Sequence, residues 1–145
     1  MLRGSIDTRD KFLLSKLDVS ELIETNFSMV KPEYDLQSLI KVISQSNRNI
    51  FPVVDDNKNL IGIVHLDKIR SVIFDSSQSQ TITVGDLMTP PSVVIQSHEN
   101  LHQILTKFEE TKVWNLPVVN QGQYVGFLSK SSILTQYRNE LMESG

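Results

Sequence analysis

The sequence of 145 residues contains no cysteine and no long hydrophobic run. Without cysteine the chain can form neither a disulfide framework nor a thiolate metal site. No apolar stretch approaches the ~20 residues that a membrane-spanning helix needs, and the opening residues MLRGSIDTRD lack the apolar core of a signal peptide. We therefore expect a soluble, cytoplasmic polypeptide.

An excess of basic charge, a glycine-rich loop and a nucleophile motif are absent as well. The 14 Lys and Arg residues are outnumbered by 17 Asp and Glu residues, whereas a dedicated nucleic-acid-binding domain usually has a basic face. The six glycines do not form a phosphate-binding loop, and no G-x-S-x-G motif occurs. These absences argue against a nucleic-acid partner and predict that the protein is not an enzyme.

What the sequence does contain is an internal repeat. A shift of 65 positions matches identical residues over the first part of each copy, and a shift of 64 does so after the turn at residues 120–123. The matches fall at apolar, proline and glycine positions, so we interpret the chain as a tandem duplication. The pairs are Val19/Val84, Leu22/Leu87, Leu36/Leu101, Pro52/Pro117, Val53/Val118, Val54/Val119, Gly62/Gly126 and Ile69/Ile133.

Each copy shows the same succession of predicted elements. Asp35 and Asn100 precede apolar stripes with the i, i+3, i+4, i+7 spacing of a helix and are expected N-caps. Two short β-branched runs follow and predict a hairpin, with Gly122 suited to the second turn. A second helix closes each copy, from Asp67 to about residue 74 and from Ser131 to about residue 142. The stripes are Leu36, Leu39, Ile40, Ile43 and Leu101, Ile104, Leu105, Phe108.

The predicted unit is strand, helix, strand, strand, helix, with a helical turn ahead of each first strand. We divide the chain into a lead-in at 1–16, a first repeat at 17–74, a polar linker at 75–82, and a second repeat with a C-terminal helix at 83–145. A repeat of ~60 residues buries little of its own surface, so the two should pack on each other.

A tandem β-α-β-β-α unit with the runs FPVVDDNKNLIGIV and LPVVNQGQYVGFLS resembles the cystathionine-β-synthase (CBS) domain pair, also called a Bateman module. The resemblance implies a mixed α/β (α+β) fold in which two CBS repeats are related by pseudo-twofold symmetry. Within that superfamily, WNLPVVNQGQYVGFLSKSSILTQYR is similar to the cytoplasmic C-terminal tail of bacterial CLC-family chloride channels and transporters.

The resemblance implies a regulatory function. CBS pairs commonly bind adenosine nucleotides in clefts between their two sheets and associate as homodimers, so ATP, ADP or AMP would be regulatory ligands and no cofactor is required. In the CLC family the neighbouring domain is a dimeric channel or transporter in the membrane, which would place this chain at the cytoplasmic face. The alternative is a CBS module of another protein, such as a divalent-cation efflux protein or a stand-alone nucleotide sensor.

The nucleotide signature of the family is Gly, apolar, any residue, Ser or Thr, two residues, then Asp. In the second copy Ser129 occupies the hydroxyl position and Ser132 the Asp position, while in the first copy His65 and Lys68 replace them. Neither copy has the acid that would accept hydrogen bonds from the ribose. The serines could instead cap the last helix.

Three further residues near the two clefts have competing interpretations. Trp114 and Asn115 could line the second cleft, with the indole stacking on a base, or Trp114 could belong to the core or an interface. Asp67, one residue before the Asp position, is a natural N-cap for the helix that follows it.

Residues 98–102, HENLH, match the zinc protease motif H-E-x-x-H formally. The repeat alignment places His98 and Glu99 ahead of the Asn100 cap, so His98 should lie outside the helix and not share a face with His102. No third ligand is apparent, and we expect no metal site.

Overall fold

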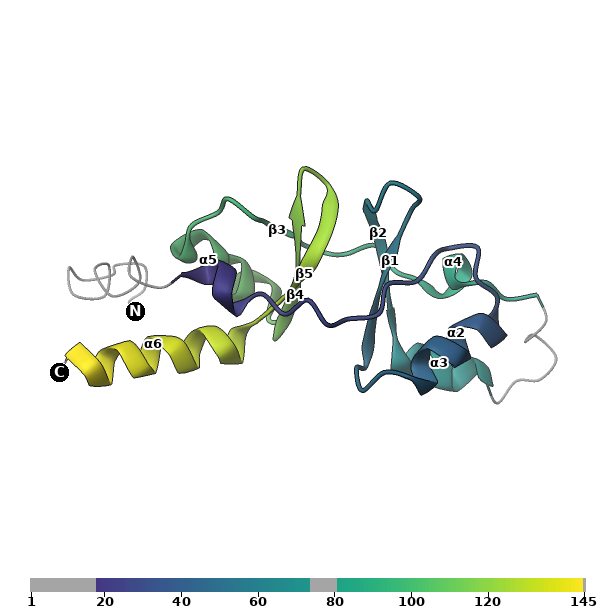
Figure 1. Cartoon of the computed structure of the whole chain (residues 1–145), viewed down its shortest axis with the longest axis horizontal. Helices are drawn as coiled ribbons and strands as arrows, with labels where there is room; N and C mark the ends of the chain where they lie inside the picture. The colour runs from purple at the N-terminus through teal and green to yellow at the C-terminus, as the bar shows by residue number, and fades with distance from the viewer. Residues whose placement is uncertain (1–17, 74–80, 145) are drawn as a thin grey trace.

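The computed structural model describes residues 18–73 and 81–144, so the lead-in and most of the linker lie outside the described residues. Two α/β repeats lie side by side, with their strands facing each other and their helices on the outer sides (Figure 1). No helix in the described part of the chain combines the length and apolarity needed to cross a membrane. The elements are η1 (Val19–Leu22), α2 (Leu36–Ser44), β1 (Ile50–Val54), β2 (Leu60–His65), α3 (Leu66–Ile73), α4 (Val84–Leu87), β3 (Ile95–Gln96), α5 (Leu101–Thr111), β4 (Asn115–Asn120), β5 (Gln123–Ser129) and α6 (Lys130–Ser144).

The first long helix of each repeat begins where the sequence predicts. Asp35 Oδ1 accepts the N–H of Ser38 at 2.8 Å, and Asn100 Oδ1 accepts that of Gln103 at 2.8 Å, so both N-caps are confirmed. The stripes are buried at Leu36, Leu39, Leu101, Ile104 and Phe108. Ile40 lies at the edge of the first stripe and is 38% exposed.

Both predicted hairpins are confirmed. Strands β1 and β2 pair antiparallel, as do β4 and β5, and Gly122 has the positive φ, 86°, that the second turn requires. The predicted first strand differs between the repeats. In the second it is β3, parallel to β4, whereas in the first it is reduced to a single bridge in which Val30 N donates to Pro52 O at 2.9 Å.

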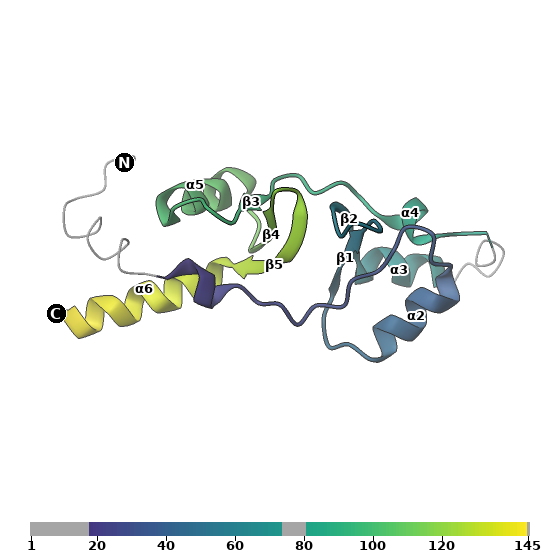
Figure 2. The same ribbon diagram turned by 45° about the horizontal axis from the view of Figure 1, so that its top comes forward.

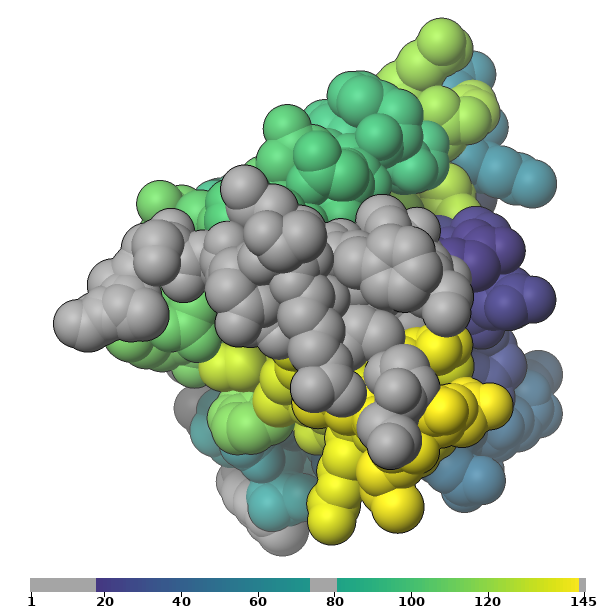
Figure 3. Space-filling model, turned by 90° about the vertical axis from the view of Figure 1, so that its left-hand side faces the viewer, coloured from purple at the N-terminus to yellow at the C-terminus, as the bar shows by residue number. Residues whose placement is uncertain are grey.

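The repeats exchange their leading helical turns, which the sequence did not predict. Val84 and Leu87 of α4 are buried in the core of the first repeat, and Val19 and Leu22 of η1 pack on the core of the second. Figure 2 shows the chain running from η1 across to the first repeat, and from α4 back to the second. Seen from the end of the second repeat, η1 lies beside α6, which it contacts (Figure 3).

The predicted packing between repeats is confirmed at the tips of the two hairpins. Leu60 N donates to Gly122 O at 3.1 Å, and Tyr124 N donates to Lys58 O at 2.9 Å. These main-chain hydrogen bonds fix the position of one hairpin tip relative to the other, because a shift of either hairpin would break them.

Candidate functional site

The chain passes directly from a strand into a helix at two equivalent places, where β2 enters α3 (the first junction) and β5 enters α6 (the second junction). The same main-chain hydrogen bond holds both. Leu66 N donates to Asn49 O at 2.9 Å, and Lys130 N donates to Trp114 O at 2.8 Å. The duplicated backbone therefore presents matched positions on which the side chains can be compared.

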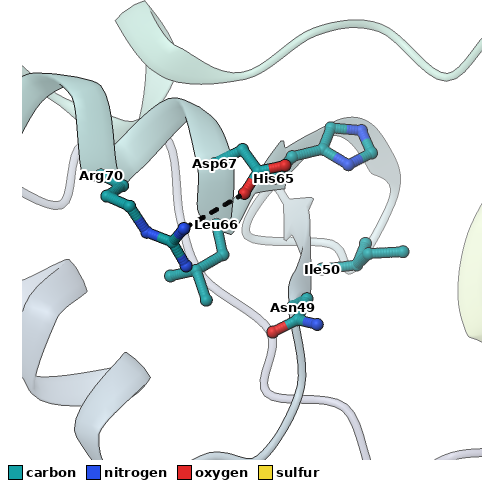
Figure 4. Close-up of a pocket in the computed structure, with 6 residues that line it drawn as sticks. All are labelled: Asn49, Ile50, His65, Leu66, Asp67 and Arg70. Atoms are coloured by element: carbon teal, nitrogen blue, oxygen red, sulfur yellow. Dashed lines mark ion pairs between the residues drawn. The ribbon is translucent and has the colours of Figure 1, made fainter.

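The first junction contains an open hollow of about 170 Å³ (Figure 4). It lies at the N-terminus of α3 and the start of β1, and all its lining residues belong to the first repeat. His65 and Asp67 are exposed there, whereas Lys68 is exposed outside it. The lining residues are Asn49, Ile50, His65, Leu66, Asp67 and Arg70.

Asp67 does not cap α3, contrary to the sequence prediction. The helix begins one residue earlier, at Leu66, so Asp67 lies inside the first turn. Its carboxylate lies 3.9 Å from the guanidinium of Arg70, in an exposed ion pair. Among the described residues no side chain accepts a hydrogen bond from the first-turn N–H groups of α3, because His65 stands at the position before the helix. Because Leu66 N already donates to Asn49 O, the N–H groups of Asp67 and Lys68 are the ones available to an anion.

At the second junction, the N-terminus of the helix is capped by Ser129. Ser129 Oγ accepts the N–H of Ser132 at 3.2 Å, so Ser129 caps α6. Besides accepting this bond, the Ser129 hydroxyl can still donate one hydrogen bond and accept a second.

Trp114 and Asn115 are both exposed at the start of β4, the indole by 57%. Lys130 Nζ lies 5.2 Å from the centroid of the Trp114 ring and 3.3 Å from Glu109 Oε2. A cation–π contact of this kind occupies one face of the indole. A base could stack only on the other face or after Lys130 had moved.

Two lining residues of the hollow, Asn49 and Arg70, were missed from the sequence. The repeat alignment shows only that they differ from their counterparts, because it matches Asn49 with Trp114 and Arg70 with Leu134. The polar pair of the first junction is thus replaced in the second by two apolar side chains, which are 57% and 43% exposed.

The HENLH segment has a structural role. The α5 helix begins at Leu101, so His98 lies outside it, as predicted. Glu99 Oε1 accepts hydrogen bonds from Gln96 N, at 2.7 Å, and from the ammonium of Lys107. Burial raises the pKa of Glu99, but the hydrogen bonds from Lys107 and Gln96 outweigh it and leave the pKa below its usual value. No group of three metal-ligating side chains occurs among residues 18–73 and 81–144.

The duplicated fold and its paired junctions define the class of the protein. The CBS domain family model matches residues 19–75 and 84–139. The chain belongs to this family and contains two CBS domains in tandem.

Among characterised proteins, the chain is similar to CBSX2, a chloroplastic CBS-domain protein of Arabidopsis thaliana. The two sequences are 26% identical over 137 residues, covering 75% of this chain and 58% of CBSX2. The crystal structure of CBSX2 in complex with AMP is 29% identical, with a TM-score of 0.66, and the match covers 88% of this chain and 98% of that one.

Other relatives carry CBS pairs in different settings. Homoserine O-acetyltransferase of Methanosphaera stadtmanae is 22% identical, over 86% of this chain and 25% of the enzyme. The CBS domain of a membrane protein from Sphaerobacter thermophilus shares the fold, with a TM-score of 0.70 and 19% identity over 88% of this chain and 94% of that one. The chain therefore spans only part of the curated relatives that it matches, 58% of CBSX2 and 25% of the acetyltransferase.

Proposed function

We propose that the chain is a non-catalytic regulatory CBS pair that binds an adenine nucleotide, with AMP as the first ligand to test. The observation that carries the proposal is the hollow at the first junction, which opens onto a helix N-terminus without a side-chain cap. The positive end of a helix and its free N–H groups stabilise a phosphate. The complex of CBSX2 with AMP supports the choice of ligand.

The phosphate and the ribose of the nucleotide each have a candidate partner in the first junction. The guanidinium of Arg70 and the first-turn N–H groups of α3 would hold the phosphate, with the ammonium of Lys68 and the imidazole of His65 nearby. Asp67 lines the hollow one residue before the acid position of the family, and its carboxylate would accept hydrogen bonds from the ribose. Binding would separate the Asp67–Arg70 pair, which at 3.9 Å and high exposure contributes little.

The second junction is the weaker candidate. Ser129 and Ser132 are joined by the helix cap, and Lys130 covers one face of Trp114. A nucleotide there would use the Ser129 hydroxyl as a donor, Asn115 for hydrogen bonds and the free face of Trp114 for stacking.

Calorimetry with AMP, ADP, ATP and NAD tests the proposal. We expect AMP to bind the full chain, and Arg70→Leu, which introduces the residue found at the matched position 134, to weaken binding by about tenfold. The matched control is Ser132→Ala in the second junction, which should bind AMP normally. If Ser132→Ala lost binding and Arg70→Leu did not, the ligand would bind at the second junction instead. The absence of heat at millimolar ligand would refute nucleotide binding.

For the wider setting, we propose a homodimer that regulates a CLC-type channel or transporter from the cytoplasmic face of the membrane. The similarity of residues 114–138 to CLC tails supports the parent protein, and the exposed side chains of Ile40, Ile73 and Leu134 on three outer helices provide apolar surface for a dimer. The alternative is a stand-alone sensor, which the similarity to the CBS-domain protein CBSX2 favours.

Two measurements separate these settings. Hydrophobic membrane spans encoded upstream of residue 1 would support the channel, and their absence would favour the stand-alone sensor. Light scattering should give the mass of a dimer for the chain and of a monomer for Leu134→Glu, because a carboxylate cannot be buried unpaired in an apolar interface. A wild-type monomer at high concentration would contradict the dimer.

A further inference from the structure

The extended segment that follows η1, residues 23–29 (the first connector), is held by one arginine of the first repeat. Arg48 lies between α2 and β1, and its guanidinium donates to Glu24 Oε1 at 2.9 Å and to Asn26 Oδ1. The same group lies 4.1 Å from the centroid of the Phe27 ring. The Arg48–Glu24 pair is only about one-third exposed, so it is less screened than a surface ion pair. Three successive contacts thus fix the connector to the first repeat.

The first connector is also fixed to the second repeat. The Phe27 and Phe127 rings lie 4.5 Å apart. Glu24 and Phe127 exchange two main-chain hydrogen bonds, of 2.8 and 3.0 Å. A Cβ atom at Gly126 would lie 2.5 Å from Glu24 O, so the connector passes directly over this glycine. Any displacement of the connector therefore changes the contact between the repeats.

The equivalent segment of the other copy, residues 88–94 (the second connector), has the backbone contact but not the arginine. Ile63 and Thr89 exchange hydrogen bonds of 2.8 and 2.9 Å, as Glu24 and Phe127 do. Val113 occupies the position that matches Arg48, and it can form neither an ion pair nor a cation–π contact. The fold therefore does not require the arginine, and its contacts are a specific addition to the first repeat.

Arg48 directly precedes, in the sequence, two residues that line the hollow. The next two residues, Asn49 and Ile50, line it, and Asn49 O accepts the N–H of Leu66 at the start of α3. We propose that Arg48 is a latch that couples the occupancy of the hollow to the position of the first connector, and through it to η1. This inference rests on the proposed nucleotide site, because a ligand must fill the hollow for the coupling to act.

Amide hydrogen exchange of the full chain tests the latch without any ligand. We expect Arg48→Leu to speed exchange of the Glu24 and Phe127 amides by about tenfold, because the connector loses its ion pair and its cation–π contact. The amides of Ile63 and Thr89, which form the same bonds at the second connector, should be unchanged.

The internal control separates local from global effects. An equal rise at Ile63 and Thr89 would show general destabilisation and would overturn the latch, as would no rise at Glu24 and Phe127. Arg138→Leu, which removes an exposed arginine of α6, should leave all four amides unchanged.

Saturating AMP tests the coupling. In the wild-type chain we expect AMP to slow exchange at Glu24 and Phe127 by about threefold, a small coupling free energy. In Arg48→Leu, AMP should bind within threefold of the wild-type affinity but no longer slow these amides. An equal slowing in the variant would overturn coupling through Arg48. If calorimetry shows no AMP binding, the proposed nucleotide function and the coupling both fail, while the ligand-free comparison still decides whether Arg48 holds the connector.

Discussion

The two strand-to-helix junctions have the same backbone and different chemistry. Both are closed by a hydrogen bond from the first residue of the helix to the residue before the hairpin, of 2.9 and 2.8 Å. The first has an uncapped helix and a polar hollow, whereas Ser129 caps the second and exposed apolar side chains surround it. In both copies main-chain bonds and buried apolar positions preserve the fold, so the exposed side chains are free to differ.

The largest expected effect is on stability, at the two glycines over which the connectors pass. The same substitution should cost more at one of them than at the other. A Cβ at Gly126 would lie 2.5 Å from the backbone oxygen of Glu24, whereas one at Gly62 would lie 2.6 Å from Sδ of Met88. Because a methionine side chain can rotate away and a paired carbonyl cannot, we expect Gly126→Ala to lower the free energy of unfolding by about 3 kcal/mol and Gly62→Ala by about 1 kcal/mol. Urea denaturation measures both, and equal losses would mean that the two crossings are equally rigid.

Substituting the residue before each helix should change the stability by a smaller amount. The change should have opposite signs in the two repeats, because one substitution removes a helix cap and the other adds one. Ser129→Ala removes the oxygen that accepts Ser132 N and should cost about 1 kcal/mol of stability. His65→Ser supplies a matching oxygen at the start of α3 and should add a few tenths to about 1 kcal/mol. Thermal melts of the two variants check the pair. A destabilised His65→Ser would show that the imidazole has a packing role that outweighs the cap.

The smallest expected effect is on the loss of stability at acid pH, and it comes from Glu99 in the second repeat. The pKa of Glu99 is lowered in the folded chain, so its ionised form stabilises the fold above the unfolded pKa, ordinarily near 4.3, and this contribution is lost as pH falls through the folded pKa. Glu99→Gln should therefore lose less stability than wild type between pH 7 and pH 3. Melting temperatures across this range test the sign, and parallel curves would show that the Lys107 pair contributes nothing.

Much of the fold could be predicted because it depends on local signals. The spacing of Leu36 and Leu39, the caps at Asp35 and Asn100, and the glycine turn at Gly122 each act within a few residues, and the structure confirms them. The duplication added long-range information, because a pattern seen twice at a constant shift is stronger than either copy. The resemblance to the CBS domain pair, carried by FPVVDDNKNLIGIV and LPVVNQGQYVGFLS, is confirmed by the family match.

The exchanged turns and the hollow could not be predicted, because both depend on contacts between distant segments. Val84 and Leu87 have the pattern of a helical turn whichever repeat they pack on. The prediction that Asp67 caps α3 was wrong because the helix begins one residue earlier, at Leu66. Arg70 becomes relevant only when α3 brings it beside Asn49 in three dimensions.

Through the exchange of η1 and α4, each repeat completes its core with residues of the other copy. The first repeat needs Val84 and Leu87 from the second to complete its core, and the second repeat packs Val19 and Leu22 from the start of the chain. Deleting either copy would therefore expose apolar core residues of the other. Because each core includes residues of the other copy, we expect the two repeats to unfold together, so a ligand bound at one junction would also protect the opposite repeat from unfolding.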